Sequence, residues 1–145
     1  MKKALVAIDQ SDISKSLISY SLNYAHQVGL DEVDFIHVMT YKDISVPGYV
    51  DFAPHLDEEK VKSEMKDMIE EGVKESGVSD IPYHLILTEG TPYAEIVETA
   101  EKGNYELLLI GHRGLSNLER FFIGSVAAKV VRHAPCDVLV HRPKE

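Results

Sequence analysis

Two kinds of hydrophobic pattern alternate along the chain. Short apolar runs bounded by polar residues are typical of buried strands, and longer segments with apolar residues every three or four positions are typical of amphipathic helices. The short runs predict strands at Ala4–Ile8, Val33–Val38, Tyr83–Thr88, Leu107–Ile110 and Asp137–His141. The longer segments predict helices from Asp12 or Ser14 to Val28, over Asp57–Ser76, from Pro92 to Gly103, and from Ser125 to His133 or Ala134.

The order of these elements predicts the fold class. A strand follows each helix, and such alternation favours an α/β domain with a mostly parallel sheet and right-handed crossovers. Glycines stand where three of the helices should stop, and Thr91 and Pro92 form a typical helix start. The chain has 145 residues, so we expect one domain spanning residues 1–145.

The segment Met39–Leu56 has no sustained period and predicts a long loop. Long loops in compact domains are usually functional or disordered. Its aromatic residues Tyr41, Tyr49 and Phe52 are compatible with a flap over a ligand, with a contact to another subunit, or with a loop packed on the core. The last two together are favoured over the first.

Composition narrows the classes of function. Hydrophobic residues make up 44% of the chain and charged residues 27%, as in ordinary globular proteins. The net charge of −9 argues against general nucleic-acid binding and against adhesion to anionic membranes. No apolar run has the length of a membrane span, and the one cysteine excludes an internal disulfide, so we expect a cytoplasmic protein.

A glycine-rich loop follows the fourth predicted strand. Gly111 and Gly114 come directly after that strand, and Gly124 and Ser125 precede the last predicted helix. Small residues before a helix N-terminus make a suitable anion site, although glycines after a strand also serve as plain turns. From His112 to His133 four basic residues stand against one acid, a local charge of +3. The P-loop and G-x-G-x-x-G motifs are both absent from the sequence.

Other chemistry has less support in the sequence. Asp9, after the first strand, is placed either to accept hydrogen bonds from a ribose or to cap the first helix. The histidines show no metal-ligand spacing, so a zinc site is not expected. The G-x-S-x-G motif of serine hydrolases is absent, and Ser125 is better placed to donate a hydrogen bond than to attack a substrate.

The spacing Gly111-x2-Gly114-x9-Gly124-Ser125 resembles the G-x2-G-x9-G-[ST] signature of the ATP-binding branch of the UspA-like universal stress proteins. The segments LVAIDQSD near the start and GSVAAKVVRHAPCDVLVHR near the end are similar to that family too. The resemblance implies a doubly wound, Rossmann-like fold of the adenine nucleotide alpha hydrolase type. Its parallel sheet would have five strands in the order 3-2-1-4-5.

The resemblance also implies roles for individual residues. Asp9 and Gly111 would lie at the ribose, Val38 would meet adenine through its backbone, and Ala7 and Ile110 would flank the base or sugar. Gly114, Gly124, Ser125 and Val126 would receive the phosphates of ATP, ADP or AMP. Arg113 would reach a phosphate or point to water, and Mg²⁺ or Mn²⁺ would be held through the phosphates.

By the same resemblance, the protein is expected to be a nucleotide-dependent regulatory or protective protein of the stress response. It would form a homodimer through the last strand, Val138, Leu139, Val140 and His141. Two alternatives remain open: a slow ATPase or phosphotransferase, for which no compelling catalytic group is present, and a dimeric interaction module whose nucleotide is structural or absent.

Overall fold

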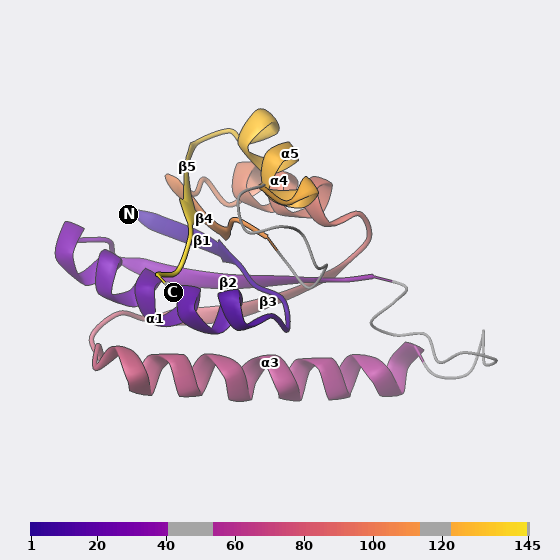
Figure 1. The fold of residues 1–145 in the computed structure, drawn as a ribbon, viewed down its shortest axis with the longest axis horizontal. Helices are drawn as coiled ribbons and strands as arrows, with labels where there is room; N and C mark the ends of the chain where they lie inside the picture. Colours follow the sequence, from indigo (N-terminus) through magenta and orange to yellow (C-terminus); the bar gives the residue numbers. More distant parts are fainter. Residues whose placement is uncertain (41–53, 114–122, 145) are drawn as a thin grey trace.

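The computed structural model describes residues 1–40, 54–113 and 123–144. Strands and helices alternate along the described chain, as the hydrophobic pattern predicted (Figure 1). The strands are β1 (Lys3–Ala7), β2 (Glu32–Met39), β3 (Tyr83–Glu89), β4 (Leu107–Gly111) and β5 (Asp137–His141). The helices are α1 (Asp12–Val28), α3 (Pro54–Ser76), α4 (Pro92–Lys102) and α5 (Ser125–His133).

All five strands form one parallel sheet in the order β3-β2-β1-β4-β5. Helices α1 and α3 cover one face of this sheet, and α4 and α5 cover the other (Figure 1). The predicted fold class and strand order are therefore confirmed. Because the strands are parallel, their carboxyl ends lie along one edge of the sheet, where ligands bind in open α/β folds.

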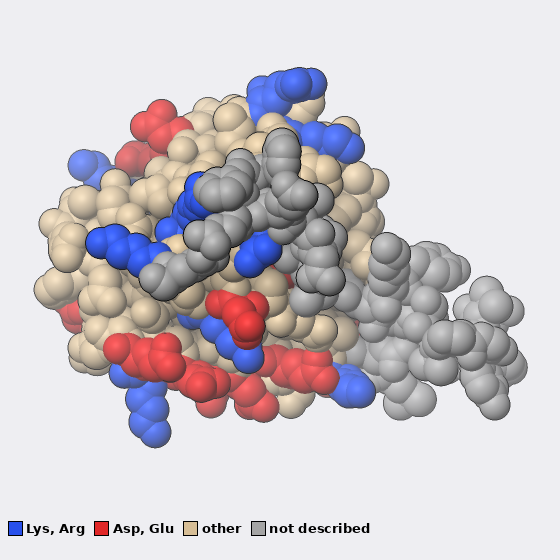
Figure 2. All heavy atoms as spheres, in the orientation of Figure 1, with Lys and Arg blue, Asp and Glu red and all other residues tan. Residues whose placement is uncertain are grey.

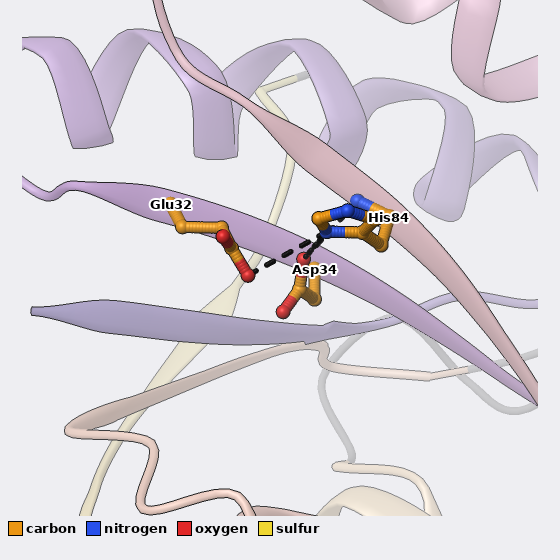
Figure 3. Close-up of side chains that lie close together, drawn as sticks. All are labelled: Glu32, Asp34 and His84. Carbon is orange, nitrogen blue, oxygen red and sulfur yellow. Dashed lines mark hydrogen bonds and ion pairs between the residues drawn. The ribbon is translucent and has the colours of Figure 1, made fainter. Parts of the chain in front are cut away.

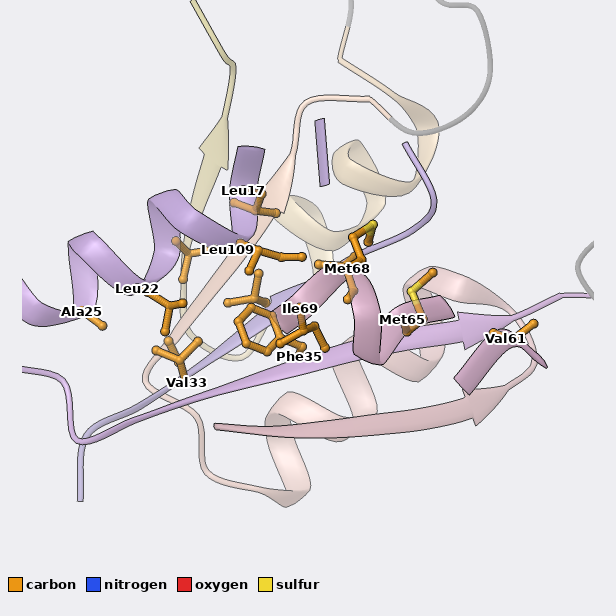
Figure 4. Close-up of a cluster of buried hydrophobic side chains, with 14 of the residues drawn as sticks. Leu17, Leu22, Ala25, Val33, Phe35, Val61, Met65, Met68, Ile69 and Leu109 are labelled. Carbon is orange, nitrogen blue, oxygen red and sulfur yellow. The ribbon is translucent and has the colours of Figure 1, made fainter. Parts of the chain in front are cut away.

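The face covered by α1 and α3 is sealed by a continuous apolar cluster (Figure 4). Phe35 of β2 and Leu109 of β4 are completely buried there. Leu17 of α1 and the side chains of Met65 and Ile69 of α3 pack onto them. The two helices pack tightly against each other, since a Cβ added at Gly72 of α3 would collide with Ile18 of α1. This layer holds the sheet rigid beneath the strand ends.

Helix α1 starts and stops at residues suited to these positions. The Ser11 hydroxyl accepts a hydrogen bond from the Ser14 backbone N–H at 3.2 Å, which makes Ser11 the N-cap. Gly29 ends the helix in a left-handed conformation with φ of 79°, which glycine adopts without strain. At the start of α4, Thr91 occupies the N-cap position, but its side chain makes no capping hydrogen bond.

The predicted loop Met39–Leu56 is too long at both ends. Met39 is the last residue of β2, and α3 begins at Pro54 rather than at Asp57. Proline is tolerated in the first turn of a helix because the N–H groups there have no intrahelical acceptor. The rest of the predicted loop, residues 41–53, lies outside the described part of the chain. In the ranges that are described, no helix combines the length and apolar character that a bilayer span requires.

Candidate functional site

A pocket of about 230 Å³ opens at the carboxyl ends of β1, β2 and β4. Residues from segments far apart in the sequence meet around it, and the apolar part of its wall includes Ala7, Val38 and Ile110. The other predicted site residues that line the pocket are Asp9, Gly111, Arg113, Gly124, Ser125 and Val126. Gly114, the remaining predicted residue, lies outside the described residues. The structure thus brings the described members of the predicted site together in one cavity.

The two described loop glycines lie where neighbouring atoms crowd the position of a Cβ, severely at Gly111 and moderately at Gly124. A Cβ on Gly111 would come within 2.5 Å of the Ile13 side chain of α1. A Cβ on Gly124 would lie 3.1 Å from the Cα of Arg113 and 3.3 Å from the His112 carbonyl oxygen. The Gly124 N–H donates a hydrogen bond to that same oxygen at 2.5 Å, so the two ends of the loop are held together beside the pocket.

The first turn of α5 supplies hydrogen-bond donors to the pocket. Gly124 is its N-cap, and Ser125, Val126 and Ala127 of the first turn all line the cavity. The first N–H groups of a helix have no intrahelical acceptor, and the helix dipole places partial positive charge at this end. The first turn of α5 contains no acidic residue that would satisfy this charge. These features favour an anionic group in the pocket.

Asp9 is not the N-cap of α1, but it supports the turn before that helix. Its Oδ1 accepts hydrogen bonds from the Ser11 backbone N–H at 2.8 Å and from the Ser14 hydroxyl at 3.0 Å. These bonds stabilise the turn before α1, although Ser11 rather than Asp9 is the N-cap. Asp9 also lines the pocket, so its carboxylate is held in position at the cavity wall.

Sequence reasoning missed several pocket residues, among them Ser14, Ile36, Thr40 and Ile96. Ile36 could have been found, since it shares the alternating face of β2 with Val38. His37 also lines the pocket, and its Nδ1 lies 2.9 Å from the Ile8 carbonyl oxygen. Because a carbonyl oxygen can only accept, Nδ1 is the donor in this bond. The hydrogen bonds of Ser14 are local, to Asp9 and Ser11, but the sequence does not show that this turn borders the pocket.

Basic side chains gather beside the pocket. A second hollow of about 210 Å³ has His112, Arg113, Arg142 and the acidic Asp12 in its lining, and it shares Arg113 with the main pocket. Figure 2 shows Lys and Arg side chains near the centre of the side of the molecule that faces the viewer. Acidic side chains gather along α3 at the lower edge of the same view. Arg113 therefore brings a positive charge to both hollows, while each described lining also contains one aspartate, Asp9 in the main pocket and Asp12 in the second.

The sheet order and the pocket at the strand ends define an α/β protein with a Rossmann-like fold. The family model described as the universal stress protein family matches residues 1–142 of the chain. A universal stress protein of Methanocaldococcus jannaschii is 32% identical over 146 residues, which cover 99% of this chain and 84% of that protein. The chain belongs to the universal stress protein family.

Solved structures show the same fold. The universal stress protein UspA from Lactobacillus plantarum superposes with a TM-score of 0.79 at 24% identity, covering 97% of both chains. A universal stress protein in complex with cAMP has a TM-score of 0.67 at 21% identity, covering 97% of this chain and 96% of that one. A universal stress protein from Archaeoglobus fulgidus in complex with dAMP has a TM-score of 0.61 at 21% identity, covering 97% of both chains.

Proposed function

We propose that this protein binds an adenine nucleotide, with ATP as the principal ligand, in the pocket at the carboxyl ends of β1, β2 and β4. In this proposal, it acts as a nucleotide-dependent regulatory or protective protein of the stress response. The observation that carries the proposal is the convergence of the predicted site residues around one cavity at the N-terminus of α5. Family members bound to cAMP and dAMP add support.

The lining of the pocket suggests how a nucleotide would lie. The apolar wall formed by Ala7, Val38 and Ile110 suits the base and sugar, and Asp9 offers a carboxylate to the ribose hydroxyls. The phosphates would lie at Gly124, Ser125 and the following N–H groups, where a helix N-terminus favours negative charge. Arg113 and Gly114 belong to the same loop and would face the phosphates. A Mg²⁺ or Mn²⁺ ion would be held mainly by phosphate oxygens.

Isothermal titration of the full chain with ATP, ADP and AMP tests the proposal. We expect saturable binding in the micromolar range and a loss of at least about tenfold in ATP affinity for Ser125→Ala, which removes one hydrogen bond to a charged group. Gly124→Val should abolish binding because its side chain would press against the Arg113 backbone. Ala128→Val adds similar bulk at an exposed position one turn further along α5 and should bind like the parent.

Two results would contradict nucleotide binding in this pocket. Absence of saturable binding up to millimolar ATP, in protein that unfolds cooperatively, would rule out a nucleotide site. Equal affinity of the parent and the Gly124→Val and Ser125→Ala variants would place the nucleotide elsewhere. Phosphate release measured on the same preparations distinguishes a binding protein from a slow ATPase, since turnover at this site must disappear in Gly124→Val.

We further propose that two chains pair through β5. This strand forms one edge of the sheet, and its apolar residues Val138, Leu139 and Val140 are only partly buried in the single chain. Exposed edge strands are usually paired or covered. Sedimentation equilibrium should give a dimer mass, and a monomer mass at high protein concentration would contradict the pairing.

A further inference from the structure

Three metal-ligating side chains meet at the opposite end of the sheet from the pocket (Figure 3). Glu32 and Asp34 stand on β2, two residues apart and therefore on the same face, and His84 stands beside them on β3. One ligand atom from each residue lies within 4.8 Å of the others. Asp34 and Val38 are separated by about 13 Å along β2, so this cluster is distinct from the nucleotide pocket.

We propose that Glu32, Asp34 and His84 form a binding site for one divalent transition-metal ion, with Zn²⁺ as the representative ion. His84 Nδ1 lies 3.2 Å from Asp34 Oδ1 and 3.6 Å from Glu32 Oε2. Ligand atoms in a tetrahedral zinc site, at bonds of about 2.0–2.2 Å, stand roughly 3.3–3.6 Å apart. The three side chains converge from neighbouring strands, and the His84 ring contacts both carboxylates (Figure 3).

The surroundings of Asp34 resemble the outer shell of a metal site. Its side chain is only 5% exposed, and its Oδ2 accepts a hydrogen bond of 2.7 Å from the Tyr105 hydroxyl. That bond fixes the carboxylate with Oδ1 toward His84. Hydrogen bonds of this kind orient the carboxylates that bind metals. Tyr105 is itself buried, so the orientation of Asp34 is set by the core and not by solvent.

The charges of the cluster also favour a bound cation. Glu32 and Asp34 place two carboxylates close together on one face of β2, and the Asp34 side chain is almost fully buried, so their like charges repel each other. Lys3 offsets part of this repulsion, and its ammonium stands over the Tyr105 ring at 4.5 Å from the centroid. A divalent ion bound between them would neutralise both carboxylates at once.

The donor set and the exposure of His84 indicate the class of ion. An imidazole nitrogen together with carboxylate oxygens suits Zn²⁺ and similar transition metals better than Mg²⁺ or Ca²⁺. The His84 side chain is 69% exposed, while Glu32 is 17% exposed. The ion therefore has an entry path on the His84 side, where water would complete its coordination.

Titration of the nucleotide-free full chain with ZnCl₂ tests this site. We expect one tightest site per chain, weakened at least about tenfold in His84→Ala and in Glu32→Gln. His26→Ala is the matched control, because His26 and Asp80 form an exposed pair with Nδ1 and Oδ2 3.5 Å apart and only one carboxylate. The control should leave the tightest site unchanged, and Mg²⁺ at millimolar concentration should not displace Zn²⁺.

Spectra of the histidine rings give a readout that is independent of affinity and of nucleotide binding. The first equivalent of Zn²⁺ should shift the ring nitrogens of His84 before those of any other histidine. Two results would overturn the proposal. One is a tightest Zn²⁺ site whose affinity is unchanged in His84→Ala. The other is a first equivalent of Zn²⁺ that shifts the ring nitrogens of a different histidine before those of His84. The proposal would also fail if no Zn²⁺ binding were tighter than that of the exposed His26–Asp80 pair. The cluster would then be an ion-pair network only.

Discussion

The two faces of the sheet differ in what they bury. On the face under α1 and α3, the buried cluster is apolar and continuous, and Phe35 and Leu109 are fully enclosed (Figure 4). The face under α4 and α5 also has an apolar cluster, but a pocket opens on this face at the carboxyl end of β2. At the amino end of β2, Asp34 is held by Tyr105 on this same face.

Within β2, residues that pack in the sealed core alternate with residues on the face that has the pocket. Alternate residues of β2 point to opposite faces, so Val33 and Phe35 belong to the sealed core while Ile36 and Val38 belong to the face with the pocket. The face under α1 and α3 contributes mainly apolar packing, although Ser14 of α1 also lines the pocket. We therefore expect substitutions on the two faces to have effects of different size and kind.

The largest effect is expected from truncation on the sealed face. Phe35→Ala removes a fully buried ring and should lower the free energy of unfolding by about 3–5 kcal/mol. Val38→Ala on the other face should cost only about 1–2 kcal/mol, because the lost methyl groups border a pocket that already exists. Urea denaturation measures both changes. Equal losses in the two variants would contradict the division between the faces.

A smaller loss is expected from Tyr105→Phe. The Tyr105 hydroxyl donates to the buried Asp34 carboxylate, and a hydrogen bond to a charged group contributes about 1.5–3 kcal/mol to stability. Tyr83→Phe is a suitable control because Tyr83 is 38% exposed, and a surface change of this kind costs less than about 0.5 kcal/mol. Thermal unfolding of the two variants distinguishes them, and similar midpoints would show that the Tyr105–Asp34 bond carries little energy.

Much of the fold could be predicted from the sequence because the central strands β1 and β4 are buried on both faces. A run such as Leu107–Ile110 is apolar throughout, as a central parallel strand requires. The ends of elements were less accurate, since Met39 and Pro54 look like loop residues until their tertiary surroundings are known. The strand order was expected from the family resemblance, because periodicity does not determine which strands are neighbours.

The pocket was predictable only in part. The spacing of Gly111 and Gly124 pointed to the loop, and both glycines line the cavity. The cluster at the other end of the sheet was missed because His84 lies 50 residues from Asp34 and is brought beside it by strand pairing. One signal was present, however. Asp34 stands between the apolar residues Val33 and Phe35 of a predicted strand, and a buried charge requires a partner.

On the sealed face, the close packing of α1 against α3 leaves little space for a larger side chain. Gly72→Ala should destabilise the protein by about 1 kcal/mol, because a Cβ there would collide with Ile18 of α1. Overpacking costs about 1–3 kcal/mol, and the better helix propensity of alanine recovers about 1 kcal/mol. Ile18→Ala removes the Cγ2 that the new Cβ would meet, so in urea denaturation the combined variant should lose less stability than the sum of the two single losses. A stabilised Gly72→Ala variant would show that α1 and α3 are free to separate.

The smallest effect should come from the pH dependence of His141, on β5 at the edge of the sheet. Burial, followed by the nearby His112, lowers the pKa of His141, while its Nε2 lies 3.0 Å from the Ser16 hydroxyl and its ring stacks on Tyr20. The unfolded chain therefore binds a proton more readily than the folded chain as pH falls below about 6.5. Stability from the neutral ring is present above that pH and is lost as the pH falls toward the folded value. Urea midpoints at pH 7.5 and 5.5 should differ less in His141→Gln than in the parent, whereas His26→Gln, at an exposed position, should keep the parent's pH dependence.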